Sequence, residues 1–176
     1  QPEWPDEQII VMNADGSGNK KIIDYGENPV FSSDGKRIYY ISSGYPEVSY
    51  SSCDLSGNDV KIHCTSKYAN EFMISPDGKW VAFKELFNVY IAAFPASGKS
   101  ITLTEKMSEV PVAKVSKDAG INMHWSKDSK KLHWTLGEEY FTAKLEDFFS
   151  FIEHGNEKGP DPAVGTKIGL EMKSNK

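Results

Sequence analysis

Short apolar runs alternate with polar turns along most of this chain. Three of the runs are rich in β-branched and aromatic residues: KRIYYIS (36–42), KWVAFKEL (79–86) and KKLHWTLG (130–137). Each run follows a cluster of turn-forming residues. Runs this short, bounded by turn signals, favour strands over helices. We therefore expect an all-β fold.

The runs belong to a repeated pattern that occurs as PVFSSDGKRIYYI (29–41), FMISPDGKWVAF (72–83) and MHWSKDSKKLHWT (123–135). Aligning Phe31, Ile74 and Trp125 gives spacings of 43 and 51 residues. Such a period is typical of β-propeller blades, in which each repeat supplies about four strands. We therefore expect blades of four antiparallel strands.

The second half of each repeat predicts a further hairpin. In the first repeat it is EVSYSSCDL–SGND–VKIHCTS (47–66), and in the second it is NVYIAAF–PASGK–SITLT (88–104). The segment EQIIVMNADGSGNKKIID (7–24) has the same form without a preceding half. After the last motif, EEYFTAKL (138–145) predicts a third strand, EDFFSFIEH (146–154) a short helix, and TKIGLEMKS (166–174) a late fourth strand.

This pattern predicts about three and a half blades. The expected boundaries are a half blade over 1–27, blades over 28–68, 69–118 and 119–160, and an exit linker or late outer strand over 161–176. Natural propellers close with about four to eight blades, and closure is what removes exposed sheet edges. We therefore expect an incomplete propeller that self-associates unless its tail or the rest of a parent protein covers its edges.

The turn between the first two strands explains a recurrent carboxylate. Asp34, Asp77 and Asp128 occupy one turn position. An Asp there bonds local backbone, so turn chemistry accounts for it better than paired catalytic carboxylates do. Ser129 replaces the glycine of the other two copies, so that turn either differs in type or carries a little strain.

These residues carry a family resemblance. FSSDGK, ISPDGK and WSKDSK resemble the TolB-like repeat of the WD-type propeller superfamily, and VMNADGSG resembles the outer hairpin of that repeat. Residues 110–147 and KIGLEMKSNK (167–176) are similar to the last blade and exit linker of propellers fused to an amidohydrolase domain. The resemblance implies a bacterial, periplasmic or secreted protein, and a metal-dependent hydrolase domain as partner. It implies no catalytic residue in this chain.

The composition of the chain limits the classes of partner that it is expected to bind. The chain has 20 basic and 25 acidic residues, a formal charge of −5, and no basic run. This balance argues against nucleic acid and anionic membranes as partners. No apolar stretch approaches the roughly 18 residues that span a bilayer, and the first residues lack the features of a signal peptide.

The usual catalytic motifs are missing from the sequence. SGKS (97–100) resembles the end of a phosphate-binding loop, but Ala93 stands where the upstream glycine belongs. There is no Gly-x-Ser-x-Gly motif. The four histidines, His63, His124, His133 and His154, show no spacing typical of a metal site, so we expect no metal and no cofactor.

Polar residues before the motif are the best candidates for a ligand site. Asn28, Glu71 and Asn122 share one position of the repeat, and His124 precedes Trp125 in the predicted innermost strand. Inner strands line the central channel of a propeller, so these side chains could hold water, a cation or a small polar ligand at its mouth. The alternative is that they are solvated strand ends.

Cys53 and Cys64 lie on the two arms of one predicted hairpin. They could form a disulfide, but a change of register by one residue would place them on opposite faces as two buried thiols.

The sequence favours a non-catalytic propeller region that serves as a scaffold or recognition module beside a hydrolase domain. Two alternatives stay open, namely a stand-alone protein-interaction propeller of a cell-envelope complex and the gating propeller of a peptidase.

Overall fold

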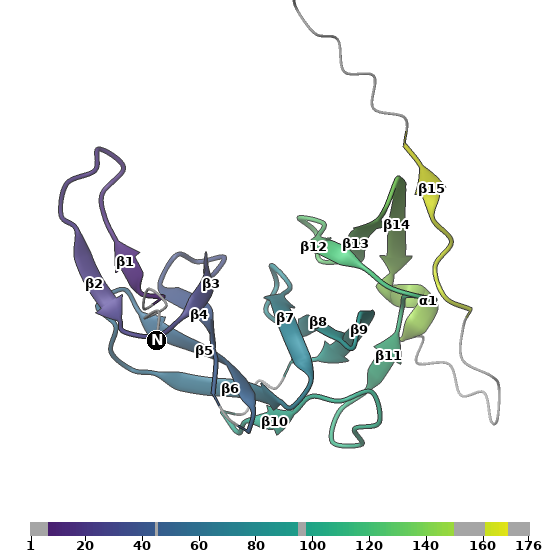
Figure 1. Ribbon diagram of the computed structural model, residues 1–176, viewed down its shortest axis with the longest axis horizontal. Helices are drawn as coiled ribbons and strands as arrows, with labels where there is room; N and C mark the ends of the chain where they lie inside the picture. The colour runs from purple at the N-terminus through teal and green to yellow at the C-terminus, as the bar shows by residue number, and fades with distance from the viewer. Residues whose placement is uncertain (1–6, 45, 95–97, 150–160, 169–176) are drawn as a thin grey trace, which may run out of the picture.

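Antiparallel sheets follow one another round an open arc in the computed structural model, which describes residues 7–44, 46–94, 98–149 and 161–168. Figure 1 shows the first strands of the blades, β3, β7 and β12, on the concave side of the arc. The fold is therefore all-β and made of propeller blades, and the described residues do not close into a ring.

The chain begins with a hairpin, as expected for the outer half of a blade. β1 (Ile9–Val11) pairs with β2 (Lys20–Ile23), and the two form a sheet of their own. We call this hairpin the half-blade. Its turn contains Gly16, whose φ of +85° lies in the left-handed region that favours glycine.

Blade 1 is the sheet that follows the half-blade. Its strands are β3 (Glu27–Phe31), β4 (Arg37–Ser42), β5 (Val48–Asp54) and β6 (Lys61–Ser66), paired in this order.

Blade 2 contains β7 (Ala69–Ile74), β8 (Trp80–Glu85), β9 (Asn88–Ala93) and β11 (Val112–Lys114). Blade 3 contains β12 (Ile121–Trp125), β13 (Lys131–Leu136), β14 (Glu139–Lys144) and β15 (Thr166–Lys167). A one-turn helix, α1 (Leu145–Phe148), follows β14. Phe149 follows the helix as its C-cap, and residues 150–154 of the expected helix lie outside the described residues.

The prediction that SITLT forms the fourth strand of blade 2 was wrong. β10 (Ile101–Thr102) instead pairs in parallel with β6 of blade 1, and β11 pairs with β9 in its place. The pairing of β10 with blade 1 has a physical reason, because it buries Leu103 completely between blades 1 and 2. The backbone of Leu103 also donates to the Thr65 carbonyl at 2.7 Å, which satisfies part of the outer edge of β6.

Apolar side chains between successive sheets form the core. One cluster joins the half-blade to blade 1, a second joins blades 1 and 2, and a third joins blades 2 and 3. In blades 1 to 3, an aliphatic and an aromatic side chain two residues apart face the preceding sheet: Ile38 and Tyr40, Val81 and Phe83, Leu132 and Trp134. Strand alternation produces this arrangement.

Two hydrogen bonds tie blade 3 to blade 2 near the repeated motif. The indole of Trp125 donates to the Met73 carbonyl at 3.0 Å. The backbone N–H of Asp77 donates to the Ser129 hydroxyl at 2.9 Å. Ser129 has a φ of +60°, close to the +68° of Gly35 and +71° of Gly78, so its turn matches theirs. Ser129 therefore combines an unfavourable φ with a bond between blades.

We expect Ser129→Ala to destabilise the fold by about 1–2 kcal/mol, because it keeps the unfavourable φ and leaves the Asp77 N–H without its acceptor. Ser129→Gly should cost less, since glycine relieves the φ while losing the same bond. Urea unfolding of both variants measures the difference. An alanine variant as stable as the parent would contradict this account.

Candidate functional site

The structure places the expected channel-mouth residues Asn28, Glu71, Asn122 and His124 on the inner strands β3, β7 and β12. Asn28 is exposed on β3 with a φ of +50°, and Asn122 is exposed on β12 with a φ of +55°. Both stand where a β-bulge interrupts the pairing with the next strand. Within the described part of the chain, no hydrogen bond or ion pair joins Asn28, Glu71 and Asn122 to one another.

Glu71 and Asn122 are instead engaged within their own blades. The Glu71 carboxylate lies 2.9 Å from the Lys84 ammonium, its neighbour across the β7–β8 pair. The Asn122 amide donates to the Thr135 hydroxyl at 3.1 Å. A cation at Glu71 would therefore have to compete with Lys84, which weakens the expectation of an ion at this position.

His124 belongs to a row of stacked rings on blade 3. Its imidazole stacks on His133 with ring centroids 5.0 Å apart, and His133 stacks on Tyr140 at 5.3 Å. We call His124, His133 and Tyr140 the histidine–tyrosine face. When His124 is neutral, its Nδ1–H donates to the Asn122 carbonyl at 3.3 Å, and its Nε2 accepts from the Tyr140 hydroxyl at 3.2 Å.

Sequence reasoning singled out His124 but missed His133 and Tyr140 as its neighbours. The signal was present, because strands on either side of a tight turn pair symmetrically about it. Counting outward from the segment 126–131 places Trp125 opposite Leu132 and His124 opposite His133, as the structure has it. Tyr140 comes from the next strand, diagonally across from His133.

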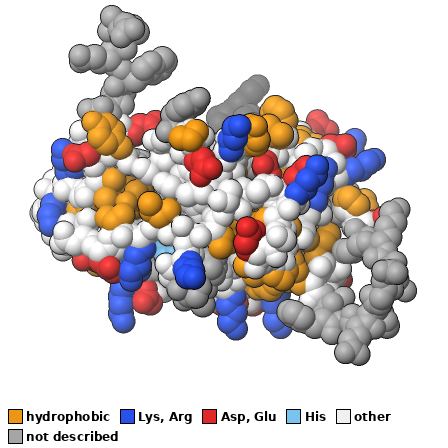
Figure 2. Space-filling model, turned by 90° about the horizontal axis from the view of Figure 1, so that it is seen from below, with side chains coloured by type: hydrophobic (Ala, Val, Ile, Leu, Met, Phe, Trp, Pro, Cys, Tyr) orange, Lys and Arg blue, Asp and Glu red, His pale blue; other side chains and the backbone are white. Residues whose placement is uncertain are grey.

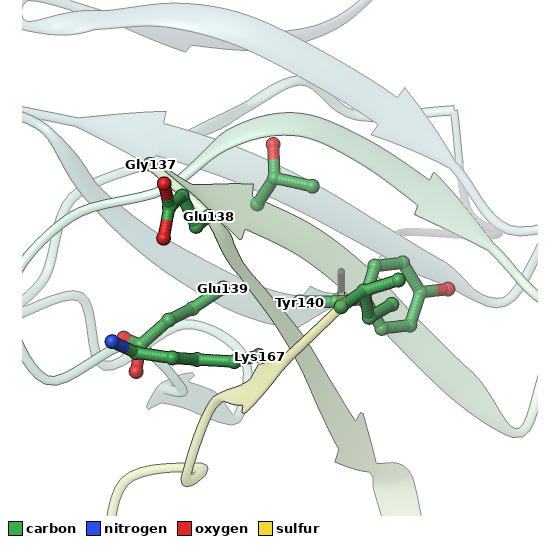
Figure 3. A pocket seen from close by; sticks show the side chains of 7 residues that line it. Gly137, Glu138, Glu139, Tyr140 and Lys167 are labelled. Carbon is green, nitrogen blue, oxygen red and sulfur yellow. The ribbon is translucent and has the colours of Figure 1, made fainter. Parts of the chain in front are cut away.

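An open groove of about 720 Å³ adjoins this face. It lies beside the β13–β14 turn and β15, as Figure 3 shows from close by. Glu139 and Lys167 extend from paired positions of β14 and β15, while Tyr140 points away from them. The groove and the face together offer stacking surface and both signs of charge, which suits recognition of a polar partner.

The recurrent turn aspartates serve their own turns. In the first copy, the Ser32 hydroxyl donates to Asp34 at 2.6 Å and holds the pKa of that carboxyl below its usual range. The Ser126 hydroxyl does the same for the pKa of Asp128. These contacts support turn chemistry as the reason for the repeated Asp.

A buried polar network in blade 1 was not anticipated. Arg37 Nε donates to the Ser52 hydroxyl at 2.9 Å, which leaves the hydroxyl proton for His63 Nε2 at 2.7 Å. Burial, together with the Arg37 and Lys61 cations, lowers the pKa of His63 to about 4. Ser52 is fully buried, so this serine–histidine pair is not an accessible nucleophile.

The two cysteines are free thiols in the structure. Cys53 packs with Ile38 against the half-blade, whereas Cys64 packs between blades 1 and 2. They lie on opposite faces of the blade 1 sheet, so of the two alternatives the structure has buried thiols and not a disulfide.

No group of three or more His, Cys, Asp or Glu side chains in the described ranges is placed to hold a metal ion. Among the same residues, no helix is long and apolar enough to cross a membrane. Figure 2 shows acidic and basic side chains interspersed over the face seen from below.

No protein-family model matches the sequence, and no curated protein matches it either. Solved structures do match. TolB from Acinetobacter baumannii is 21% identical with a TM-score of 0.61, over 80% of this chain and 36% of that chain. Hydrazine synthase from Kuenenia stuttgartiensis is 18% identical with a TM-score of 0.54, over 80% of this chain and 47% of that chain.

The β-propeller domain of the Trilobed protease from Pyrococcus furiosus is 14% identical with a TM-score of 0.52, over 90% of this chain and 50% of that chain. This chain therefore spans half or less of the length of these three proteins. The likeness shows the fold, which is a β-propeller fold like that of TolB.

The pKa of His133 is lowered, mainly by burial and also by its neighbour His124. A histidine with a lowered pKa in the folded state contributes stability above its ordinary value of 6.5, and that stability is lost as the pH falls through the folded pKa. We expect His124→Gln to raise the pKa of His133 part of the way towards 6.5. NMR titration of the His133 ring measures this shift.

His63→Gln is the matched control, because His63 lies in blade 1 and should leave the titration of His133 unchanged. An unaltered pKa of His133 in His124→Gln would show that the two rings do not interact electrostatically.

Burial raises the pKa of the Cys64 thiol to about 12 and also raises the pKa of Cys53. We expect the same intact mass with and without reductant, and alkylation of both thiols only after unfolding. An exposed Ser56→Cys variant should react in the folded state and serves as the control. A mass difference on reduction would mean that the cysteines pair.

Proposed function

We propose that this chain is a non-catalytic β-propeller region that acts as a scaffold or recognition module of a larger bacterial protein of amidohydrolase type. Its partners are the rest of a propeller and a hydrolase domain, and the location is periplasmic or secreted. The resemblance of the sequence motifs supports the hydrolase partner and the location.

The main support for the scaffold role is that both ends of the arc present sheet surfaces suited to contacts with other parts of a larger protein. At the first end, the half-blade and β3 border an apolar groove of about 230 Å³. At the other end, blade 3 presents the histidine–tyrosine face and its neighbouring groove. The polar residues that recur in the repeats are engaged in turns, as the Asp34 and Asp128 contacts illustrate.

Two similarities to solved structures each support an alternative function. The likeness to TolB supports a protein-interaction propeller of a cell-envelope complex. The likeness to the Trilobed protease propeller supports a gating propeller of a peptidase. The parent reading frame discriminates among the three: a barrel domain with His-x-His after residue 176 supports the hydrolase partner, a serine hydrolase elbow supports the peptidase, and no further domain supports the interaction propeller.

We expect the isolated chain to self-associate reversibly, because apolar side chains at the first end are exposed, among them Phe31 at 60%. Sedimentation velocity across a range of concentrations measures this as a rising average mass. A strictly monomeric species at the highest concentration would contradict the expectation that the exposed ends of the arc associate.

A further inference from the structure

Strand pairing in blade 3 brings two histidines face to face. His124 on β12 lies directly opposite His133 on β13, and their ring centroids are 5.0 Å apart with an angle of 25° between the ring planes. We call these two residues the histidine pair. The expectation of no metal site was drawn from spacing along the sequence, which does not register a pair formed across strands.

The blade fold itself does not require imidazoles at these positions. The same cross-strand pair is Met73 and Ala82 in blade 2, and Val30 and Tyr39 in blade 1. Neither of these pairs contains a nitrogen ligand. The histidine pair is therefore a property of blade 3 and not of the repeat.

Each ring of the histidine pair has a hydrogen-bond partner at Nδ1. The Nδ1 atom of His124 lies 3.3 Å from the Asn122 carbonyl oxygen, and that of His133 lies 2.8 Å from the Thr142 hydroxyl. A carbonyl can only accept, so the neutral His124 ring carries its proton on Nδ1 and has a lone pair on Nε2. The Thr142 hydroxyl can accept from His133 in the same way. An outer partner that holds Nδ1–H while Nε2 stays available is the usual arrangement around metal-binding histidines.

Tyr140 places a third donor atom beside the histidine pair. Its ring centroid lies 5.9 Å from that of His124 and 5.3 Å from that of His133, and its hydroxyl lies 3.2 Å from Nε2 of His124. His124 is exposed, and His133 and Tyr140 are half-buried, so solvent reaches the three rings. Because one of the three is a tyrosine, the set is not a group of three or more His, Cys, Asp or Glu side chains.

We propose that the histidine pair binds a divalent transition-metal ion such as Zn²⁺ or Cu²⁺ through Nε2 of each ring, with the Tyr140 hydroxyl as a neighbouring donor. Imidazole nitrogen suits these ions, whereas Mg²⁺ and Ca²⁺ prefer oxygen ligands. Zinc–nitrogen bonds are about 2.0–2.1 Å long, so the two Nε2 atoms have to come within about 4 Å of each other. The exposed His124 ring is free to tilt towards His133 about its side-chain torsions.

The test uses the full chain, stripped of metal with a chelator, and Zn²⁺ or Cu²⁺ alone as the probe. We expect calorimetry with Zn²⁺ to show saturable one-to-one binding. Electron paramagnetic resonance of the Cu²⁺ form should show coupling to two imidazole nitrogens. His124→Gln should weaken the binding of either ion by about tenfold or more, because it removes one of two nitrogen ligands.

Matched variants locate the ion. His63→Gln is the control, since His63 is a partly buried ring of blade 1 that bonds to Ser52, and it should leave the affinity unchanged. Thr142→Val removes the outer partner of His133 and should weaken binding by about tenfold. Thr142→Ser keeps the hydroxyl and should bind as the parent does.

Three outcomes overturn the inference: no saturable binding of either ion, equal affinity in the parent and in His124→Gln, or copper coupling to fewer than two imidazole nitrogens in the parent. The second outcome would place the ion elsewhere in the chain. None of them contradicts the scaffold function, which requires no metal and is tested separately by the association of the chain and by the parent reading frame.

Discussion

Face-to-face packing of successive sheets is the constraint on which this structure depends. A strand pair in water is marginal by itself, and each blade becomes stable because its neighbours cover both of its faces. Blade 2 illustrates this, since Val81 and Phe83 pack towards blade 1 while Ala82 and Ile91 pack towards blade 3. The two ends of the arc are the places where this condition is only half met.

Specific polar contacts fix the relative position of neighbouring blades, because apolar packing alone would allow one sheet to shift along the next. The bond from Asp77 to Ser129 and the bond from Trp125 to Met73 both join the motif of blade 3 to that of blade 2. Ser129 stands where glycine would be conformationally easier, so the hydroxyl contact offsets an unfavourable φ. The repeated turn thus acts as both a hairpin connection and a contact between blades.

Local patterns predicted most of the fold, and the late return of β15 to β14 was also predicted, but the pairings of β10 and β11 were missed. Turn residues and β-branched runs located the motif hairpins because both signals lie within a few residues of each strand. The path of β10 could not be read in this way, since its partner β6 lies far away in sequence and the burial of Leu103 decides the pairing. At the candidate site, His124 was predicted from the repeat, but the stack with His133 and Tyr140 depends on cross-strand register.

The two ends of the arc make different demands on a partner. Four positions of each blade face the next one: Tyr39, Ile41, Tyr50 and Ser52 in blade 1, Ala82, Lys84, Val89 and Ile91 in blade 2, and His133, Thr135, Tyr140 and Thr142 in blade 3. The blade 3 set contains no aliphatic residue, and its side chains already bond one another or a side chain of β12, as His133 does with Thr142 and Tyr140 with His124, so water can cover it at little loss. At the first end, exposed Ile10 and Met12 gain free energy only from apolar cover. The exposed surface of the half-blade therefore favours apolar contacts, and that of blade 3 favours polar contacts.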